Sequence, residues 1–543
     1  MNSQFSTKLA GNLYWSLVAV LTLMNSTIIF FGFHEHHDGL MLSTIRVAKE
    51  SFLSGGDYPF NQYGSFWIAP YLAISFITPD SLLLASMRLV TFLMYLLTGV
   101  YTYKIAAQIF NTRVAKISIL LFILAHPIGL EPIPWPSSVS MFLTIFLTWL
   151  MISHASRANR NHAAYYLAAA GAVCVMNILT RVQIGFLSTA VIIFYLIITN
   201  WRNIIYFLYG SIGFSIAYFA ILFQLGWLSD SLRDEFLFGW VVAISSQTDR
   251  TLPKTSLVFL TIALLFVFIL RLLKNRLRTS RFLVVLSAWV ALITLIVAKI
   301  ILVDFSTMVG KIWVAVLIFA CLLGGVKFLE AFQRGNYQEC LLVGLGLAAA
   351  SQIYPLFDIM HAWWGLTPIL IILANQIDLA ITRHNLLWNL TPAVVLASFA
   401  LIATHALGTL APSSEVDQKD LRLIRLDPAS AKSYNELSGF FAEHIPDGSS
   451  VLNLCEDGRI FFRPNYVQSE SRYFIYWSVM EKVEGIRNSL LKSKPDYVVR
   501  CSDPKSPEVD SIIKKFTSAP YLFQGEFKAG ERTVTIYKAP AAK

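Results

Sequence analysis

The side chains best suited to chemistry are concentrated in one short stretch, HEHHD, which directly follows the first long apolar run. Its three histidines, His34, His36 and His37, could hold a metal ion, and histidine beside aspartate also suits acid–base catalysis. In a helix, His34 and Asp38 would share a face at i, i+4 spacing. The alternative is an interfacial loop whose histidines bind no ligand, and the lack of a His/Cys zinc signature favours this second interpretation.

A second candidate stretch, SQIYPLFDIMHAWWG, places Asp358 and His361 three residues apart at the mouth of an apolar run. His361 could donate to a phosphate while Asp358 fixes its tautomer. The two tryptophans that follow, Trp363 and Trp364, are explained equally well by a membrane-interface belt.

Cations stand where membrane topology alone would not favour them. Arg181, in ILTRVQIG, lies at a turn, and Lys311 follows a glycine at the start of an apolar run. Both suit a phosphate diester or pyrophosphate, and the alternative is a long side chain that simply reaches the interface. Glu131, in the proline-rich GLEPIPWPSS, is either a second site carboxylate or a turn residue.

Composition shows which elements must position these side chains. Of 543 residues, 56% are hydrophobic and only 14% are charged, whereas about a quarter of an ordinary globular domain is charged. Apolar runs of spanning length recur as far as residue 410. The formal net charge of +10 belongs almost wholly to this membrane half, where it records topology rather than nucleic-acid binding.

The positive-inside rule orients the runs. Short basic connections, such as residues 104–116, 157–160 and 271–281, are expected to stay in the cytoplasm. The longer acidic or aromatic connections, such as residues 34–80, then lie outside. This alternation predicts a plasma (inner) membrane protein with about 13 helices, a cytoplasmic amino terminus and an outer carboxy-terminal tail. Residues 66–77 suit an interfacial helix better than a span, as does LMLSTIRVAKESFL behind Asp38.

The topology gathers the unusual polar residues on one side. Ionisable groups at membrane depth are costly and are functional candidates by default. Those expected at outer helix ends are Glu35, Asp38, Arg88, Glu131, Arg181, Asp304, Lys311, Asp358 and His361. Their convergence predicts a site that faces outward.

The last part of the chain has the composition of a soluble domain and not of a membrane segment. Residues 412–543 carry frequent, nearly balanced charges and no run long enough to span. We predict an α/β domain there, with helices at 431–444 and 478–491, strands in SVLNLC and DYVVRC, and a hairpin formed by FQGEF and RTVTIYK. The chain therefore divides into a transmembrane domain, 1–411, and an extracytoplasmic α/β domain, 412–543.

This layout resembles the GT-C glycosyltransferases, a superfamily that includes the protein O-mannosyltransferases, the aminoarabinose-lipid A transferases and the arabinofuranosyltransferases. The features in common are an acidic residue after the first helix, interfacial helices in the first outer loop, about 13 spans and an outer α/β tail. The local matches are HHDG, MRLVTFLMYLLTGVYTYKIAAQIFNTRVAK and YPLFDIMHAWW. The Lys-Pro-Pro motif of the lipid A enzymes and the Trp-Trp-Asp signature of oligosaccharyltransferases are absent, which leaves the substrate open.

The resemblance implies a polyprenyl-phosphate sugar as donor, an inverting transfer outside the membrane, and a cell-envelope glycan, lipid or protein as acceptor. It implies that the first-loop carboxylate is the base, which maps onto Asp38, with Glu35 and Glu131 as competitors. No metal is required, although a divalent ion could join the histidines. The substrate-binding candidates are Arg181, Lys311, His361, Asp358 and Arg88.

Two other classes of protein fit the same composition. A flippase or transporter of lipid-linked sugars would want charges along a path through the bilayer, and its usual inverted repeat is not evident. A noncatalytic subunit of an envelope assembly complex would use the tail as its binding module. The concentration of charges on one side favours the enzyme.

Overall fold

The computed structural model describes most of the helical half of the chain and parts of the tail. The described residues are 3–26, 29–32, 37–55, 63–125, 134–156, 160–232, 321, 323–353, 359–383, 414–415, 421–453, 467–468, 496–502, 522–529 and 532–539.

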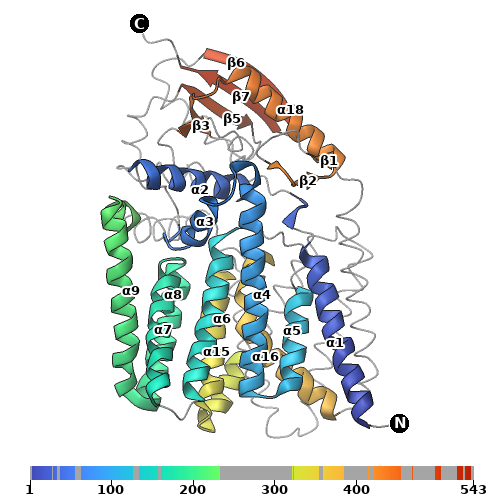
Figure 1. The fold of residues 1–543 in the computed structure, drawn as a ribbon, viewed down its shortest axis with the longest axis vertical. Coiled ribbons are helices and arrows are strands. Elements are labelled where there is room, and N and C mark those ends of the chain that lie inside the picture. The colour runs from blue at the N-terminus through green and yellow to red at the C-terminus, as the bar shows by residue number, and fades with distance from the viewer. Residues whose placement is uncertain are drawn as a thin grey trace, which may run out of the picture.

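Long helices run side by side and form the body of the molecule (Figure 1). They are α1 (Ser3–Ser26), α4 (Leu83–Ile109), α5 (Thr112–Ala125), α6 (Pro136–Ala155), α7 (Arg160–Ile178), α8 (Val182–Asn200), α9 (Ile204–Gln224), α15 (Tyr337–Ala350) and α16 (Ile359–Arg383). Local sequence fixes several of their starts. Pro136 occupies the first turn of α6, where its missing N–H costs nothing. The side chain of Asn336 caps α15 by accepting from the Glu339 N–H.

The protein is a membrane protein. Among the described residues, three helical stretches are long and apolar enough to cross a bilayer: Asp80–Ile109, Pro136–Ala155 and Val182–Gln224. The stretch 182–224 contains both α8 and α9, joined by the turn η3 (Trp201–Asn203). The predicted number of about 13 spans stays a prediction, because residues 233–320 and 384–413 lie outside the described part.

Two further helices lie at one end of the bundle, which we call the sheet end. Helix α2 (His37–Ser54) lies across the ends of the long helices, and α3 (Ile68–Ser75) lies between it and the bundle (Figure 1). The ion pair Lys49–Asp80, at 3.2 Å, joins α2 to the turn η2 (Asp80–Leu82) that precedes α4. These are the two segments for which the sequence predicted interfacial helices.

Helices α7 and α9 approach each other unusually closely. A Cβ atom at Gly210 would lie 1.7 Å from the Ala168 carbonyl oxygen, and one at Gly171 would lie 2.0 Å from that of Phe207. Small residues at such a crossing allow backbones to pack directly, which is a main source of helix association in lipid.

We expect Gly210→Ala to loosen this crossing, because the methyl group can be accommodated only if the backbones separate. Overpacking of this kind costs about 1–3 kcal/mol. The same helix offers a matched control, since a Cβ at Gly213 would meet nothing within 4 Å. Thermal inactivation in detergent should therefore occur at lower temperature for Gly210→Ala, whereas Gly213→Ala should match the wild type. Equal stability of the two variants would contradict the close packing.

The tail contributes a five-stranded mixed sheet in the order β4-β3-β5-β7-β6. The strands are β3 (Ser450–Asn453), β4 (Val467–Gln468), β5 (Tyr497–Ser502), β6 (Leu522–Ala529) and β7 (Arg532–Lys538). Strands β4, β3 and β5 are parallel, and β5, β7 and β6 are antiparallel. Helix α18 (Pro428–His444) packs on this sheet, with the ring of Phe440 stacked 5.5 Å from that of Phe527 (Figure 1).

Four of these strands lie in the stretches for which the sequence predicted strands, and α18 contains the helix predicted at 431–444. It begins three residues earlier because Asp427 caps it, accepting from the Ala429 and Ser430 N–H groups, and Pro428 follows. The helix predicted at 478–491 lies outside the described residues. The division into two domains at residue 411 stays a prediction.

Candidate active site

A buried ion pair stands at the sheet end. Asp38 lies in the first turn of α2, and Arg88 lies in the second turn of α4. The Arg88 Nη2 donates to Asp38 Oδ2 at 2.6 Å, and neither side chain has any exposed surface. A charge pair in such a place requires good geometry and further hydrogen bonds, because both ions have lost their hydration.

The guanidinium of Arg88 also binds the chain that leads from α1 to α2. It donates to the carbonyl oxygens of Ile29 and Phe31, each at 3.4 Å, and to that of Gly32 at 3.1 Å. Gly32 has φ +78°, a conformation that glycine adopts without strain. Arg88 therefore joins three elements, α4, α2 and the connection after α1, in a fixed arrangement.

Arg181 lies at the same end of the bundle, at the N-cap of α8. Its guanidinium stands over the ring of Tyr63, 4.9 Å from the centroid, and Tyr63 meets Trp135 edge to face at 5.3 Å. Arg181 is only half-buried, unlike Arg88. A cation at the start of a 19-residue helix adds to the positive end of the helix dipole, so an anionic group would be favoured here.

The structure thus brings the predicted site residues Asp38 and Arg88 into contact and places Arg181 at the same end of the bundle. For the other candidates, the side chain or the whole residue lies outside the described part. Of the candidates, His37 and His361 lie in α2 and α16, but their side chains are outside the described part. Residues wholly outside it are His34, Glu35, His36, Glu131, Asp304, Lys311 and Asp358.

One polar residue that the sequence analysis did not select is buried at this end. Gln352 lies in the short turn η5 (Ser351–Ile353) and is 1% exposed. Both atoms of its side-chain amide are buried without a hydrogen-bond partner in the part of the chain that the structure describes. The neighbouring Ser351 carbonyl accepts from Gln183 of α8 at 3.2 Å. Nothing in the local sequence marks this residue, since a single glutamine three residues before a proline is typical of a turn.

Among the described residues there is no group of three or more His, Cys, Asp and Glu side chains that could hold a metal ion. The side chains of the HEHH stretch, which the sequence offers as possible metal ligands, lie outside the described part.

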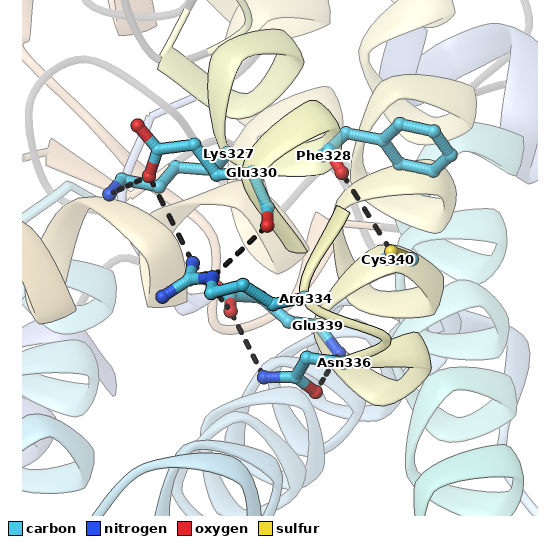
Figure 2. Close-up of polar contacts among 7 residues, drawn as sticks. All are labelled: Lys327, Phe328, Glu330, Arg334, Asn336, Glu339 and Cys340. Atoms are coloured by element: carbon cyan, nitrogen blue, oxygen red, sulfur yellow. Dashed lines mark hydrogen bonds and ion pairs between the residues drawn. The ribbon is translucent and has the colours of Figure 1, made fainter. Parts of the chain in front are cut away.

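Charged residues at the opposite end of the bundle have a structural explanation. Figure 2 shows Glu330 between Lys327, at 3.0 Å, and Arg334, at 3.9 Å, with Arg334 also 3.8 Å from Glu339. The Asn336 side chain donates to Glu339 while it caps α15. These contacts close the turn between the helical residues 323–333 and α15. In the same region, Arg113 of α5 pairs with Asp378 of α16 at 2.7 Å.

No family model matches the sequence, and no curated protein sequence matches it. Solved structures do resemble the fold. The oligosaccharyltransferase of Archaeoglobus fulgidus, in a complex with Zn and sulfate, gives a TM-score of 0.48 at 12% identity, over 89% of this chain and 67% of that one. ArnT of Cupriavidus metallidurans, bound to undecaprenyl phosphate, gives 0.43 at 14% identity, over 96% and 97%.

An A. fulgidus AglB structure with an inhibitory peptide and a dolichol-phosphate gives a TM-score of 0.46 at 13% identity, over 90% of this chain and 69% of that one. All three TM-scores lie below 0.5, and all three identities lie below 15%.

Proposed function

We propose that this chain is an inverting membrane glycosyltransferase that moves a sugar from a polyprenyl phosphate to an envelope glycan, lipid or protein. The observation that carries the proposal is the fully buried Asp38–Arg88 pair at the start of the helix that lies across the bundle end. Burying two charges is expensive, and at membrane depth such residues usually serve function. A sugar attached to a lipid phosphate emerges from the bilayer at this depth.

In the proposed reaction, an acceptor hydroxyl attacks the anomeric carbon of the donor. The bond from that carbon to the phosphate oxygen breaks, the hydroxyl proton passes to the Asp38 carboxylate, and polyprenyl phosphate leaves. One base is sufficient for inversion, so a second carboxylate need not be a nucleophile. Because Asp38 has no exposed surface, the site must open before an acceptor can reach its carboxylate.

The two arginines receive different roles in this proposal. Arg181, half-buried at a helix N-terminus, binds the donor phosphate together with Lys311 and His361, and Asp358 fixes the tautomer of His361. Arg88 contacts Asp38 and three carbonyl oxygens, so it serves the site by fixing the base.

The orientation is also part of the proposal. Placing the sheet end outside the plasma membrane puts the basic turn of Figure 2 in the cytoplasm, in accordance with the positive-inside rule. The amino terminus would then be cytoplasmic and the tail extracytoplasmic (Figure 1).

A purified full-length protein tests the proposal directly. It would be incubated in nanodiscs with a panel of undecaprenyl-phosphate monosaccharides and with glycan, lipid or peptide acceptors. We expect release of undecaprenyl phosphate and a product whose anomeric configuration, measured by NMR, is opposite to that of the donor. Retained configuration would contradict a single base. If the protein moves the donor between the leaflets of proteoliposomes and leaves the bond between sugar and phosphate intact, it is a flippase and not a glycosyltransferase.

Arg181→Ala should raise the KM for the donor about 10- to 100-fold, because a charged hydrogen bond to phosphate is worth about 1.5–3 kcal/mol. Arg181→Lys should recover part of the loss, since it keeps the charge without the planar fork. Arg202→Ala is the control, because this arginine is exposed in the turn η3 at the other end of α8. Donor kinetics identical in Arg181→Ala and Arg202→Ala would remove Arg181 from the site.

A further inference from the structure

The connection between α1 and α2 is held from two sides. On one side, Arg88 donates to the carbonyls of Ile29, Phe31 and Gly32. On the other side, the tail supplies one residue. The Arg425 N–H donates to the Phe30 carbonyl at 2.7 Å, and the Gly32 N–H donates to the Arg425 carbonyl at 3.0 Å. Arg425 thus forms a single parallel β-bridge with Phe31.

The tail residue that makes this bridge is itself firmly anchored. Leu421 and Ile424 are each 1% exposed, and with Leu426 they join the continuous apolar core that contains Leu21 of α1 and Met41 of α2. The Ile424 N–H donates to the Leu421 carbonyl at 2.9 Å and closes the turn between them. We call residues 421–427 the tail clamp.

The turn inside the clamp is strained in a way that its anchors explain. Leu423 has φ +74°, the left-handed region, and is exposed. For a non-glycine residue this conformation is unfavourable, because Cβ approaches the following carbonyl oxygen. Leu421 and Ile424 can both enter the core only if the chain reverses between them, so their burial offsets the strain. Asp427 then caps α18 and ties the clamp to the sheet.

These contacts form one connected series from the tail to the carboxylate. Arg425 fixes the backbone of Phe30 and Gly32, that backbone fixes the guanidinium of Arg88, and Arg88 fixes Asp38 at 2.6 Å. We infer that the tail clamp positions the Asp38–Arg88 pair, with the peptide group of Arg425 as a positioning group. The catalytic consequence rests on the proposed function, whereas the mechanical connection does not.

The test is a comparison of two substitutions at one position in the full-length protein. Arg425→Pro removes the N–H that donates to Phe30. Arg425→Ala keeps the peptide group and removes the exposed side chain, so the difference between the two variants measures the contribution of the peptide N–H. Arg422→Ala controls for the loss of one exposed positive charge. In Arg425→Pro, hydrogen–deuterium exchange across residues 29–45 should be at least about tenfold faster, because the backbone hydrogen bonds to the clamp are lost.

The kinetic readout separates positioning from binding. A misplaced base should lower kcat about 10- to 100-fold. The donor KM should stay unchanged, because Arg181 is the N-cap residue of α8 and its guanidinium stands over the ring of Tyr63, in a segment separate from the clamp. Ile424→Asn provides a second route, since it weakens the apolar anchor without altering the Arg425 peptide. Ile424→Asn should also show faster exchange across residues 29–45 and a lower kcat, and it keeps the inference testable if Arg425→Pro does not fold.

Three outcomes would overturn the inference. One is exchange across residues 29–45 that is the same in Arg425→Pro, Ile424→Asn and wild type. Another is faster exchange across residues 29–45 in Arg425→Pro with an unaltered kcat, which would mean that the clamp holds this segment but does not position the Asp38–Arg88 pair. The third is an Arg425→Ala variant as impaired as Arg425→Pro, which would show that the side chain of Arg425, and not its peptide group, is responsible. If wild type transfers no sugar, the proposed function fails, and the exchange measurement still tests the clamp.

Discussion

Asp38→Asn should slow sugar transfer about 10²- to 10⁴-fold, the usual cost of losing a general base. Asparagine keeps the size of the side chain and can still accept a hydrogen bond from Arg88, but it cannot take up the proton of the acceptor hydroxyl. Donor binding should survive, because the base faces the acceptor and the phosphate lies with Arg181. The measurement is single-turnover transfer from a saturating undecaprenyl-phosphate sugar.

The donor KM distinguishes a base from a residue that only supports the fold. Asp38→Asn should lower the single-turnover rate while the KM for the donor stays unchanged, whereas a structural defect would impair both. Size-exclusion chromatography would confirm that the variant is folded.

Two other carboxylates serve as the comparison. Glu35 lies three residues before Asp38, and Glu131 lies in the proline-rich loop before α6. We expect Glu35→Gln and Glu131→Gln to keep most of the activity. Near-normal turnover in Asp38→Asn with a dead Glu35→Gln or Glu131→Gln would reassign the base. Normal sugar transfer by all three variants would mean that none of these carboxylates is the base.

Local patterns predicted the elements that position the site. The amphipathic stretch behind Asp38 is α2, and the proline-bounded segment at 66–77 contains α3. Both predictions depended on residues within a few positions of each other, and neighbouring residues alone determine helical periodicity. The strand β7 begins and ends at the residues of RTVTIYK for the same reason.

Long-range pairing could not be predicted in this way. Asp38 and Arg88 were both candidates, but 50 positions separate them, and nothing in either segment specifies the other. The sequence placed Arg88 among the substrate-binding candidates, which stays a prediction. Its contacts with a carboxylate and three carbonyls could not be foreseen. The tail clamp was missed for the same reason, since Arg425 acts through its peptide group and a peptide group has no sequence signature.

Arg88→Met should destabilise the protein by about 3–5 kcal/mol, because it leaves the Asp38 carboxylate buried without its cation. Methionine has a similar length and no charge, so little of the effect should come from lost volume. The three carbonyls after α1 also lose their donor. Unfolding by SDS in mixed micelles would report the change, and transfer activity should vanish with it.

A double variant shows whether the charge is responsible. A buried ion pair can often be replaced by apolar residues without loss of stability, whereas removal of one partner is costly. Asp38→Leu combined with Arg88→Met should therefore recover most of the stability that Arg88→Met loses, yet remain inactive because the base is gone. A double variant as unstable as the single one would mean that the contacts of Arg88 with Ile29, Phe31 and Gly32 dominate its contribution. A double variant that is stable and still transfers sugar would show that the buried pair is not the catalytic site.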